Sequence, residues 1–237
     1  MIIFVKLLLA HLIGDFILQP TAWVVDKEKK VYRSVYLYIH SALHGLLAIV
    51  LINETAFLRY ALLLAVLHGL IDFLKLQFQQ KQTKRNWFIA DQLLHLLVLI
   101  GITFLYHNQI PDFSFADNHF WIVVTALVLL TKPASIIIKN IISIWTPENK
   151  LDKTDDSLQN AGNYIGILER LFVFYFVMTG HYEAVGFLLA AKSIFRFGDL
   201  KEAKDRKLTE YVLIGTLLSF GLAFLVGLLT NYCLLFG

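Results

Sequence analysis

Long apolar segments alternate with short polar loops along almost the whole chain. A helix that crosses a membrane needs ~20 mostly apolar residues, because each residue adds ~1.5 Å. Eight segments fit this description: residues 2–19, 35–52, 57–76, 87–106, 119–138, 163–180, 183–198 and 209–235. The pattern therefore predicts an all-α, polytopic transmembrane helical bundle with eight spans.

Two of these segments depart from the simple pattern. Residues 183–198 make the shortest span, and Lys132-Pro133 interrupts the span at 119–138. Proline removes a helix hydrogen bond, so we expect the helix to kink or end there. The stretch that follows, 135–145, then either continues the span or lies along the membrane interface.

The composition agrees with a membrane protein. Of the 237 residues, 57% are hydrophobic and 16% are charged, whereas about a quarter of a typical soluble domain is charged. Cys233 is the single cysteine, which excludes an internal disulfide and a cysteine-rich metal site.

Basic residues gather in the loops that follow the odd-numbered spans. Such loops lie on the cytoplasmic side of a membrane, so both termini are expected outside. We interpret these residues as determinants of topology that touch anionic headgroups, not as a nucleic-acid site. They are Lys27, Lys29, Lys30 and Arg33, then Lys81, Lys84 and Arg85, then Lys139, Lys150 and Lys153, and finally Lys201, Lys204, Arg206 and Lys207.

Each of the first four spans carries two ionisable residues at i, i+4, a spacing that places both on one helix face. Counted from the cytoplasmic ends, they form two layers, ~6 Å and ~12 Å deep. The outer layer holds Asp15, His40, Asp72 and Asp91, and the inner layer holds His11, His44, His68 and His95.

Part of this pattern is repeated. HLIGDFILQ at 11–19 and HGLIDFLKLQ at 68–77 share H-x3-D-F, which favours a two-helix unit used twice in parallel. We therefore expect residues 1–106 to form a four-helix His/Asp half and residues 107–237 a second four-helix half, within one integrated membrane domain.

The paired residues predict a metal site. Ionisable groups in a membrane are costly, and helix packing is achieved more cheaply with Ser, Thr or Gly. Imidazole and carboxylate donors without cysteine suit zinc, or manganese and iron, and helical bundles can hold two such ions. The expected ligands are His11, Asp15, His44, His68, Asp72 and His95, with Asp91 or His40 as general base. A His/Asp proton relay is the alternative.

Further polar residues have two interpretations each. Gln19, Gln92 and Glu210 either orient the ligands from outside or are ordinary interface residues. Lys75 either steers an anionic group or extends to the interface. Glu169, Arg170, Lys192 and Arg196 either lock helices as ion pairs or bind a phosphate or carboxylate. Gly162 and Gly166 have the spacing of a close helix contact.

These motifs resemble those of a family of bacterial polytopic membrane proteins that is described as a domain of unknown function. The resemblance implies a multi-pass protein of the bacterial inner membrane and no established activity. More loosely, the His/Asp helices are similar to inner-membrane proteins predicted to be metal-dependent hydrolases, a likeness that transfers no residue roles. The matching residues are His11 to Gln19, His40 and His44, His68 and Asp72, Asp91-Gln92 with His95, Gly162 to Arg170, and Lys192 with Arg196.

We expect a metal-dependent hydrolase that acts from the cytoplasmic leaflet on an anionic, phosphorylated lipid-like substrate. Membrane lipid is the expected partner. A divalent-cation or proton-coupled transporter is the first alternative, and a structural protein that binds a partner is the second. The outer halves of two spans, LLAIVLI (46–52) and LVLIGITFLY (97–106), are apolar, so the polar path ends inside the membrane, which favours an enzyme over a transporter.

Overall fold

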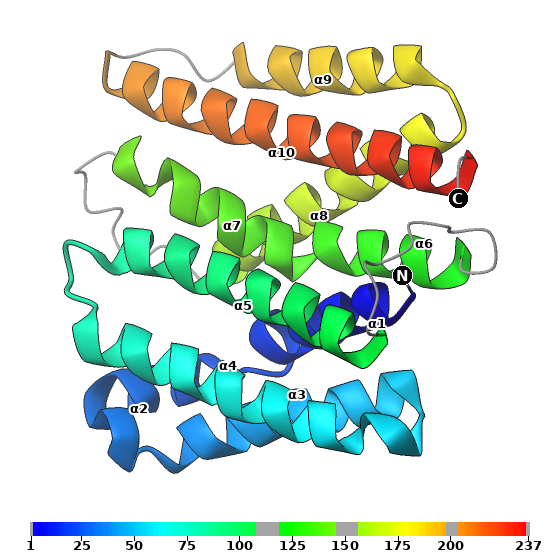
Figure 1. The fold of residues 1–237 in the computed structure, drawn as a ribbon. Helices are drawn as coiled ribbons and strands as arrows, with labels where there is room; N and C mark the ends of the chain where they lie inside the picture. Colours follow the sequence, from blue (N-terminus) through cyan, green and yellow to red (C-terminus); the bar gives the residue numbers. More distant parts are fainter. Residues whose placement is uncertain (1, 108–118, 146–155, 198–202, 236–237) are drawn as a thin grey trace. The chain divides into compact units, whose positions relative to one another are not determined.

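The computed structural model describes residues 2–107, 119–145, 156–197 and 203–235 (Figure 1). These residues form helices and connecting turns, and no strand is present among them. The chain divides into two compact units, residues 1–125 with 236–237 (unit 1) and residues 126–235 (unit 2). The boundary falls within the helix α6, and each unit is described by itself.

Unit 1 begins with a helical segment over residues 2–17, close to the span predicted at 2–19, and the helix breaks where this segment ends. The helix α1 (Ile2–Leu12) passes into a π-helical turn, Ile13–Ile17, which is closed by a hydrogen bond of 2.8 Å from Leu18 N to Ile13 O. Pro20 then precedes a second helix, α2 (Thr21–Lys30), inclined by 83° to the first.

Three long helices complete the main part of unit 1. They are α3 (Val35–Ile52), α4 (Leu58–Phe78) and α5 (Lys84–His107). α3 ends at Asn53, whose left-handed backbone (φ 57°) suits asparagine at a helix terminus. Short 3-10 turns, Val31–Arg33 and Thr55–Phe57, precede α3 and α4. The long helices match the predicted spans closely because their apolar runs are uninterrupted.

The buried faces of these helices are polar at one end and apolar at the other. On α3 the buried stripe runs His40, His44, Ala48, Ile52 at steps of four residues. The apolar end of this stripe joins a continuous hydrophobic core to which α1, α3, α4 and α5 all contribute. This core consists of Ile3, Leu7, Ala48, Ile52, Phe57, Ala61, Leu64, Leu99 and Ile102. The polar path therefore ends against packed apolar side chains.

Unit 2 contains the end of α6 (His119–Leu130), α7 (Lys132–Ile142), a 3-10 turn at Ser143–Trp145, α8 (Asp156–Met178), α9 (Tyr182–Phe197) and α10 (Ala203–Leu235). α10 packs closely on α8, where a Cβ on Gly227 would lie 2.7 Å from Val177. The close helix contact expected at Gly162 and Gly166 is not found among the described residues: a Cβ on Gly162 would meet no atom within 4 Å, and one on Gly166 would meet only Arg170 Nη1 of the same helix, at 3.5 Å.

The predicted interruption at Lys132-Pro133 is confirmed. α6 and α7 meet at Thr131 with a bend of 44°, and Pro133 lies in the first turn of α7. Proline is well tolerated there because the first N–H groups of a helix lack an intrahelical acceptor.

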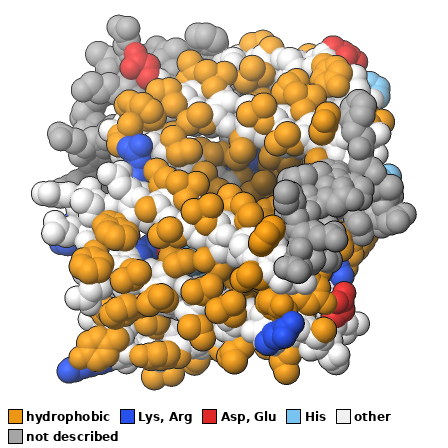
Figure 2. Space-filling model, in the orientation of Figure 1, with side chains coloured by type: hydrophobic (Ala, Val, Ile, Leu, Met, Phe, Trp, Pro, Cys, Tyr) orange, Lys and Arg blue, Asp and Glu red, His pale blue; other side chains and the backbone are white. Residues whose placement is uncertain are grey.

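Several helices are long and apolar enough to cross a membrane. Within the described residues, four qualify on length and hydropathy, and up to six do so when each bent pair is taken as one span. Hydrophobic side chains cover much of the surface seen in Figure 2. Leu62, Leu97 and Phe187 are more than 60% exposed. Large exposed apolar surfaces are typical of lipid contact.

Candidate metal centre

Unit 1 brings together all eight ionisable residues of the predicted pattern. They come from α1 with its π-helical turn, α3, α4 and α5, and together form what we call the His/Asp cluster. All five histidines are at most 5% exposed, as are Asp72 and Asp91. The i, i+4 spacing explains this convergence, since each pair shares one face of its helix.

Asp15 lies at the centre of the cluster. Its Oδ1 is 3.0 Å from His44 Nε2, 3.1 Å from His40 Nε2 and 3.4 Å from His68 Nε2. Its Oδ2 accepts a hydrogen bond of 3.1 Å from Gln92 Nε2. One carboxylate oxygen therefore faces three imidazole nitrogens at a shared point.

The four histidines of the inner layer pack ring against ring. The ring centroids of His44 and His68 are 3.6 Å apart and those of His68 and His95 are 4.0 Å apart, both stacked. His11 lies 5.1 Å from His95 and 5.6 Å from His44. The rings form a compact group above Asp15, and none of them can shift without displacing a neighbour.

The π-helical turn makes room for this group. A Cβ on Gly14 would lie 2.5 Å from His44 Cε1 and 2.6 Å from His44 Nε2. Any side chain at this position would therefore push His44 out of its place beside Asp15. π-helical turns are often found at functional sites, since they alter which side chains face the interior.

The outer side of the cluster contains a residue that the sequence did not indicate. Lys27 of α2 is 5% exposed and donates a hydrogen bond of 2.6 Å to Asp72 Oδ2. The sequence pattern predicts Lys27 to be a loop residue that sets topology. The break at Pro20 instead turns α2 back so that this lysine enters the cluster.

A second ammonium group lies at the same end of α4. Lys75 Nζ donates to Asp91 Oδ2 at 2.8 Å, and Gln92 Nε2 donates to the same oxygen at 3.2 Å. Since Gln92 also binds Asp15, this amide holds the two carboxylates in a fixed relation. Gln19 Nε2 lies 2.8 Å from His40 Nε2, so Gln19 contacts a candidate base, and its role in orienting metal ligands stays a prediction.

Three groups within the cluster have ligand atoms close enough for one metal ion, within 4.8 Å of one another. They are His11, Asp15, His44 and His68, then His40, His68 and Asp72, and then Asp15, Asp91 and His95. Within the described residues, several of the atoms concerned are buried without a hydrogen-bond partner, among them Asp91 Oδ1 and both ring nitrogens of His95. Buried polar atoms are normally paired, so these atoms are suited to bind an ion.

The first group is the best suited of the three. Its Asp15 has no lysine partner, whereas Lys27 and Lys75 neutralise Asp72 and Asp91. The second group shares His68 with the first. Because one imidazole nitrogen binds one metal ion, the two groups cannot both use the same nitrogen of His68.

The cationic residues expected to bind substrate in the second half have their described partners within unit 2. Lys192 donates to Glu169. The Arg170 guanidinium is 3% exposed and bonds Leu130 O at 2.7 Å and Thr131 O at 3.1 Å. It also donates to Ser135 and Ser219.

These contacts make Arg170 the partner of the carbonyl groups at the α6–α7 break. Substrate binding by Glu169, Arg170 and Lys192 stays a prediction. Arg196 lies on α9, and its side chain is outside the described part of the chain. Glu210 is exposed near the start of the apolar part of α10.

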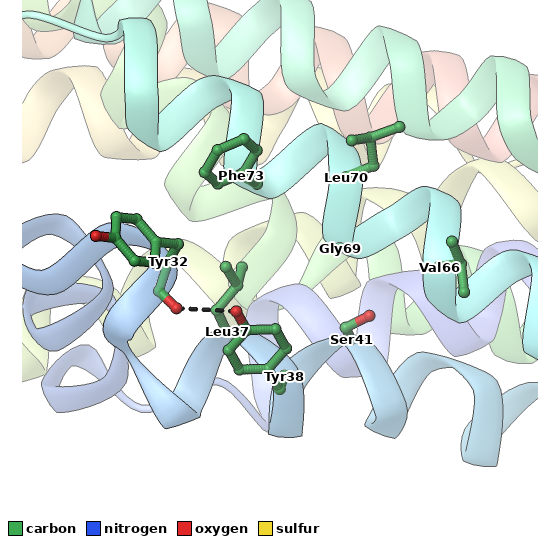
Figure 3. A pocket seen from close by; sticks show the side chains of 8 residues that line it. All are labelled: Tyr32, Leu37, Tyr38, Ser41, Val66, Gly69, Leu70 and Phe73. Atoms are coloured by element: carbon green, nitrogen blue, oxygen red, sulfur yellow. Dashed lines mark hydrogen bonds between the residues drawn. The ribbon is translucent and has the colours of Figure 1, made fainter.

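An apolar groove of about 470 Å³ lies between α3 and α4 in unit 1 (Figure 3). Ser41 and Gly69 line it where the two helices approach closely, and they directly follow His40 and His68 of the cluster. Tyr38 donates a hydrogen bond of 2.9 Å to Tyr32 O at one end of the groove. Successive residues of a helix point about 100° apart. The groove therefore lies on a different face of α3 and α4 from the one that carries His40 and His68.

Residues 3–118 match the family model described as Protein of unknown function (DUF3307). The match covers just under half of the chain, and it contains the whole His/Asp cluster with Lys27 and Lys75. The first part of the chain is thus similar to a family of unknown function. No curated protein and no solved structure matches the chain.

Proposed function

We propose that this protein is a membrane-embedded, metal-dependent hydrolase that acts from the cytoplasmic leaflet on an anionic, phosphorylated lipid-like substrate. One observation carries the proposal. Ligand atoms of His11, Asp15, His44 and His68 lie within 4.8 Å of one another, and the buried Asp15 Oδ1 faces His44 Nε2 at 3.0 Å and His68 Nε2 at 3.4 Å.

The donor set fits a divalent ion. Three imidazoles and one carboxylate suit zinc, or manganese and iron. Gln92 binds both His11 and Asp15, so it would orient two of the four ligands, as the outer partners of metal sites commonly do.

A divalent metal held by these donors would polarise the scissile group and make a water molecule a stronger nucleophile at neutral pH. Asp91 is the better of the two candidate bases. Lys75 and Gln92 hold its Oδ2. Its Oδ1 accepts no hydrogen bond within the described part of the chain and lies 3.8 Å from His95 Nδ1, so this oxygen can take a proton from water. His40 Nε2, by contrast, is already in contact with Gln19 and His68.

Two features favour an enzyme that acts on lipid. Beyond the inner histidines, the helices pack through a hydrophobic core. The polar path therefore does not continue toward the non-cytoplasmic side, and a path that ends in this way is unsuited to transport. The groove between α3 and α4 is apolar and belongs to two candidate spans, so an acyl chain can lie beside the helices that carry His40 and His68.

The deciding measurement is the metal content of the protein purified in detergent. We expect about one ion per chain in the wild type and in His181→Ala, which removes an exposed histidine of unit 2. Asp15→Asn and His44→Ala should lose the ion. A wild-type protein that stays free of zinc, manganese and iron after reconstitution would refute the proposal.

The hydrolase activity is tested separately on metal-loaded protein in lipid nanodiscs. We expect phosphate release from phosphatidic acid or a lipid diphosphate. Asp91→Asn should keep the metal while turnover falls by roughly 10²–10⁴, the usual contribution of a general base. Stoichiometric metal without hydrolysis of any phosphorylated lipid would retain the metal centre and contradict the activity.

A further inference from the structure

The helix α2 is attached to the cluster by a charged side chain. Lys27 is the one buried residue of α2, and its neighbours Glu28, Lys29 and Lys30 are exposed. Burying an ammonium group carries a large desolvation penalty, which Asp72 only partly offsets. An apolar side chain would anchor the helix at less cost, so the lysine points to a role in binding.

The ammonium groups of the buried Lys27 and the half-buried Lys75 both retain donors for a ligand. A lysine ammonium has three N–H donors, and within the described part of the chain Asp72 is the only hydrogen-bond partner of Lys27. Lys75 likewise donates to Asp91. Asp72 and Lys75 are three residues apart on α4, so their side chains are neighbours on the helix surface.

The charge balance of the cluster depends on the metal. With neutral histidines, the carboxylates of Asp15, Asp72 and Asp91 exceed the two lysines by one negative charge. A divalent cation changes the balance to one positive charge. In a buried, low-dielectric site this favours an anion, and it favours one only after the metal is present.

We propose that Lys27 and Lys75 form a binding site for a phosphate-type oxyanion at the outer edge of the His/Asp cluster. This inference rests on the proposed metal centre and deepens it by naming the groups that hold the substrate. A phosphate offers several acceptor oxygens, so it can take hydrogen bonds from two ammonium groups at once. The phosphate is either that of a lipid headgroup or free phosphate.

The test is a titration of zinc-loaded protein in detergent with inorganic phosphate, followed by the shift in thermal unfolding temperature. Metal content is measured on the same samples. We expect Lys27→Met and Lys75→Met to weaken phosphate binding by roughly ten- to a hundredfold, the value of one charge-assisted hydrogen bond. Lys30→Met is the matched control, since Lys30 lies on the same helix and is exposed, and it should bind phosphate as the wild type does.

The outcomes separate this proposal from the metal centre. Wild type without metal refutes the proposed function, and the oxyanion site with it. Retained metal with unchanged phosphate binding in Lys27→Met overturns the oxyanion site alone. If Lys27→Met loses metal or fails to fold, the charge-balanced double variant Lys27→Met/Asp72→Asn decides: phosphate binding equal to that of the wild type would overturn the proposal, and metal binding without phosphate binding would support it.

The source of the phosphate is resolved in nanodiscs. Competition with free phosphate by phosphatidic acid, and not by phosphatidylcholine, identifies a lipid headgroup with an accessible phosphomonoester. Equal phosphate affinity in both kinds of nanodisc identifies the free ion. Zinc-loaded protein that binds neither inorganic phosphate nor phosphatidic acid would overturn the oxyanion site.

Discussion

Asp15 has different surroundings from the other two carboxylates of the cluster. Asp72 and Asp91 each receive a lysine, at 2.6 and 2.8 Å, whereas Asp15 faces histidines. Imidazole nitrogens that converge on a carboxylate form a donor set that a divalent metal ion can bind. The residue that keeps this arrangement open is Gly14, since its missing side chain admits the ring of His44.

Gly14→Ala is therefore expected to weaken metal binding at least tenfold. Alanine is the better helix former by about 1 kcal/mol, so helix propensity alone would stabilise the variant. The weaker metal binding must instead come from displacement of His44. The measurement is competition for zinc with a chelator. Gly101→Ala is the control, because a Cβ on Gly101 would meet no atom within 4 Å. Equal zinc affinity in both variants would mean that His44 moves without cost.

Helix breaks are the main departures from regular structure at the scale of elements. The break after α1 brings Lys27 to the cluster, and the break between α6 and α7 is closed by Arg170. In both cases a cation meets polar groups that an unbroken helix would not present. Carbonyl groups at a helix end need partners when no water is near.

Arg170→Gln is expected to destabilise the protein by about 3 kcal/mol or more, because two carbonyl groups and two hydroxyls lose a charged donor. Arg170→Lys should not restore stability, since a single ammonium cannot reach all four acceptors. Thermal unfolding in detergent measures the effect. Lys192→Met removes a partly exposed ion pair and should change stability by less than about 1 kcal/mol. An equally small effect of Arg170→Gln would contradict the proposed role of this arginine.

The whole molecule combines a family-matched first part with a second unit that the family model does not reach. The basic loops predict its orientation, and the helix boundaries make that orientation testable. α3 and α4 are both candidate spans, so the turn at Glu54 must lie on the side of the membrane opposite to α2 and the α4–α5 turn.

Single cysteines in a Cys233→Ser background test this orientation. Lys29→Cys and Lys81→Cys should react with a membrane-impermeant maleimide only after cell lysis, and Glu54→Cys should react in intact spheroplasts. All three positions are exposed in the structure, so failure to react reports sidedness and not burial. Labelling of Lys29→Cys in intact spheroplasts would reverse the predicted topology.

Sequence reasoning was most successful where the signal is local. The pairs His40/His44 and Asp91/His95 lie on uninterrupted helices, so residue spacing alone predicts a shared face. The close approach expected from Gly162 and Gly166 failed because spacing does not say whether a neighbouring helix is present. Lys27 carried no local signal that distinguished it from Lys29 or Lys30.

The helical segments, the apolar faces and the residues that share each polar face can be predicted from the amino-acid pattern, because they follow from periodicity within a few turns. The 83° turn of α2 after α1, the pairing of Lys27 with Asp72 and the contact of Arg170 with a helix break 39 residues away are visible in the folded structure alone. These contacts depend on the direction that the chain takes after a break. That direction is set by packing between distant segments, which no local pattern encodes.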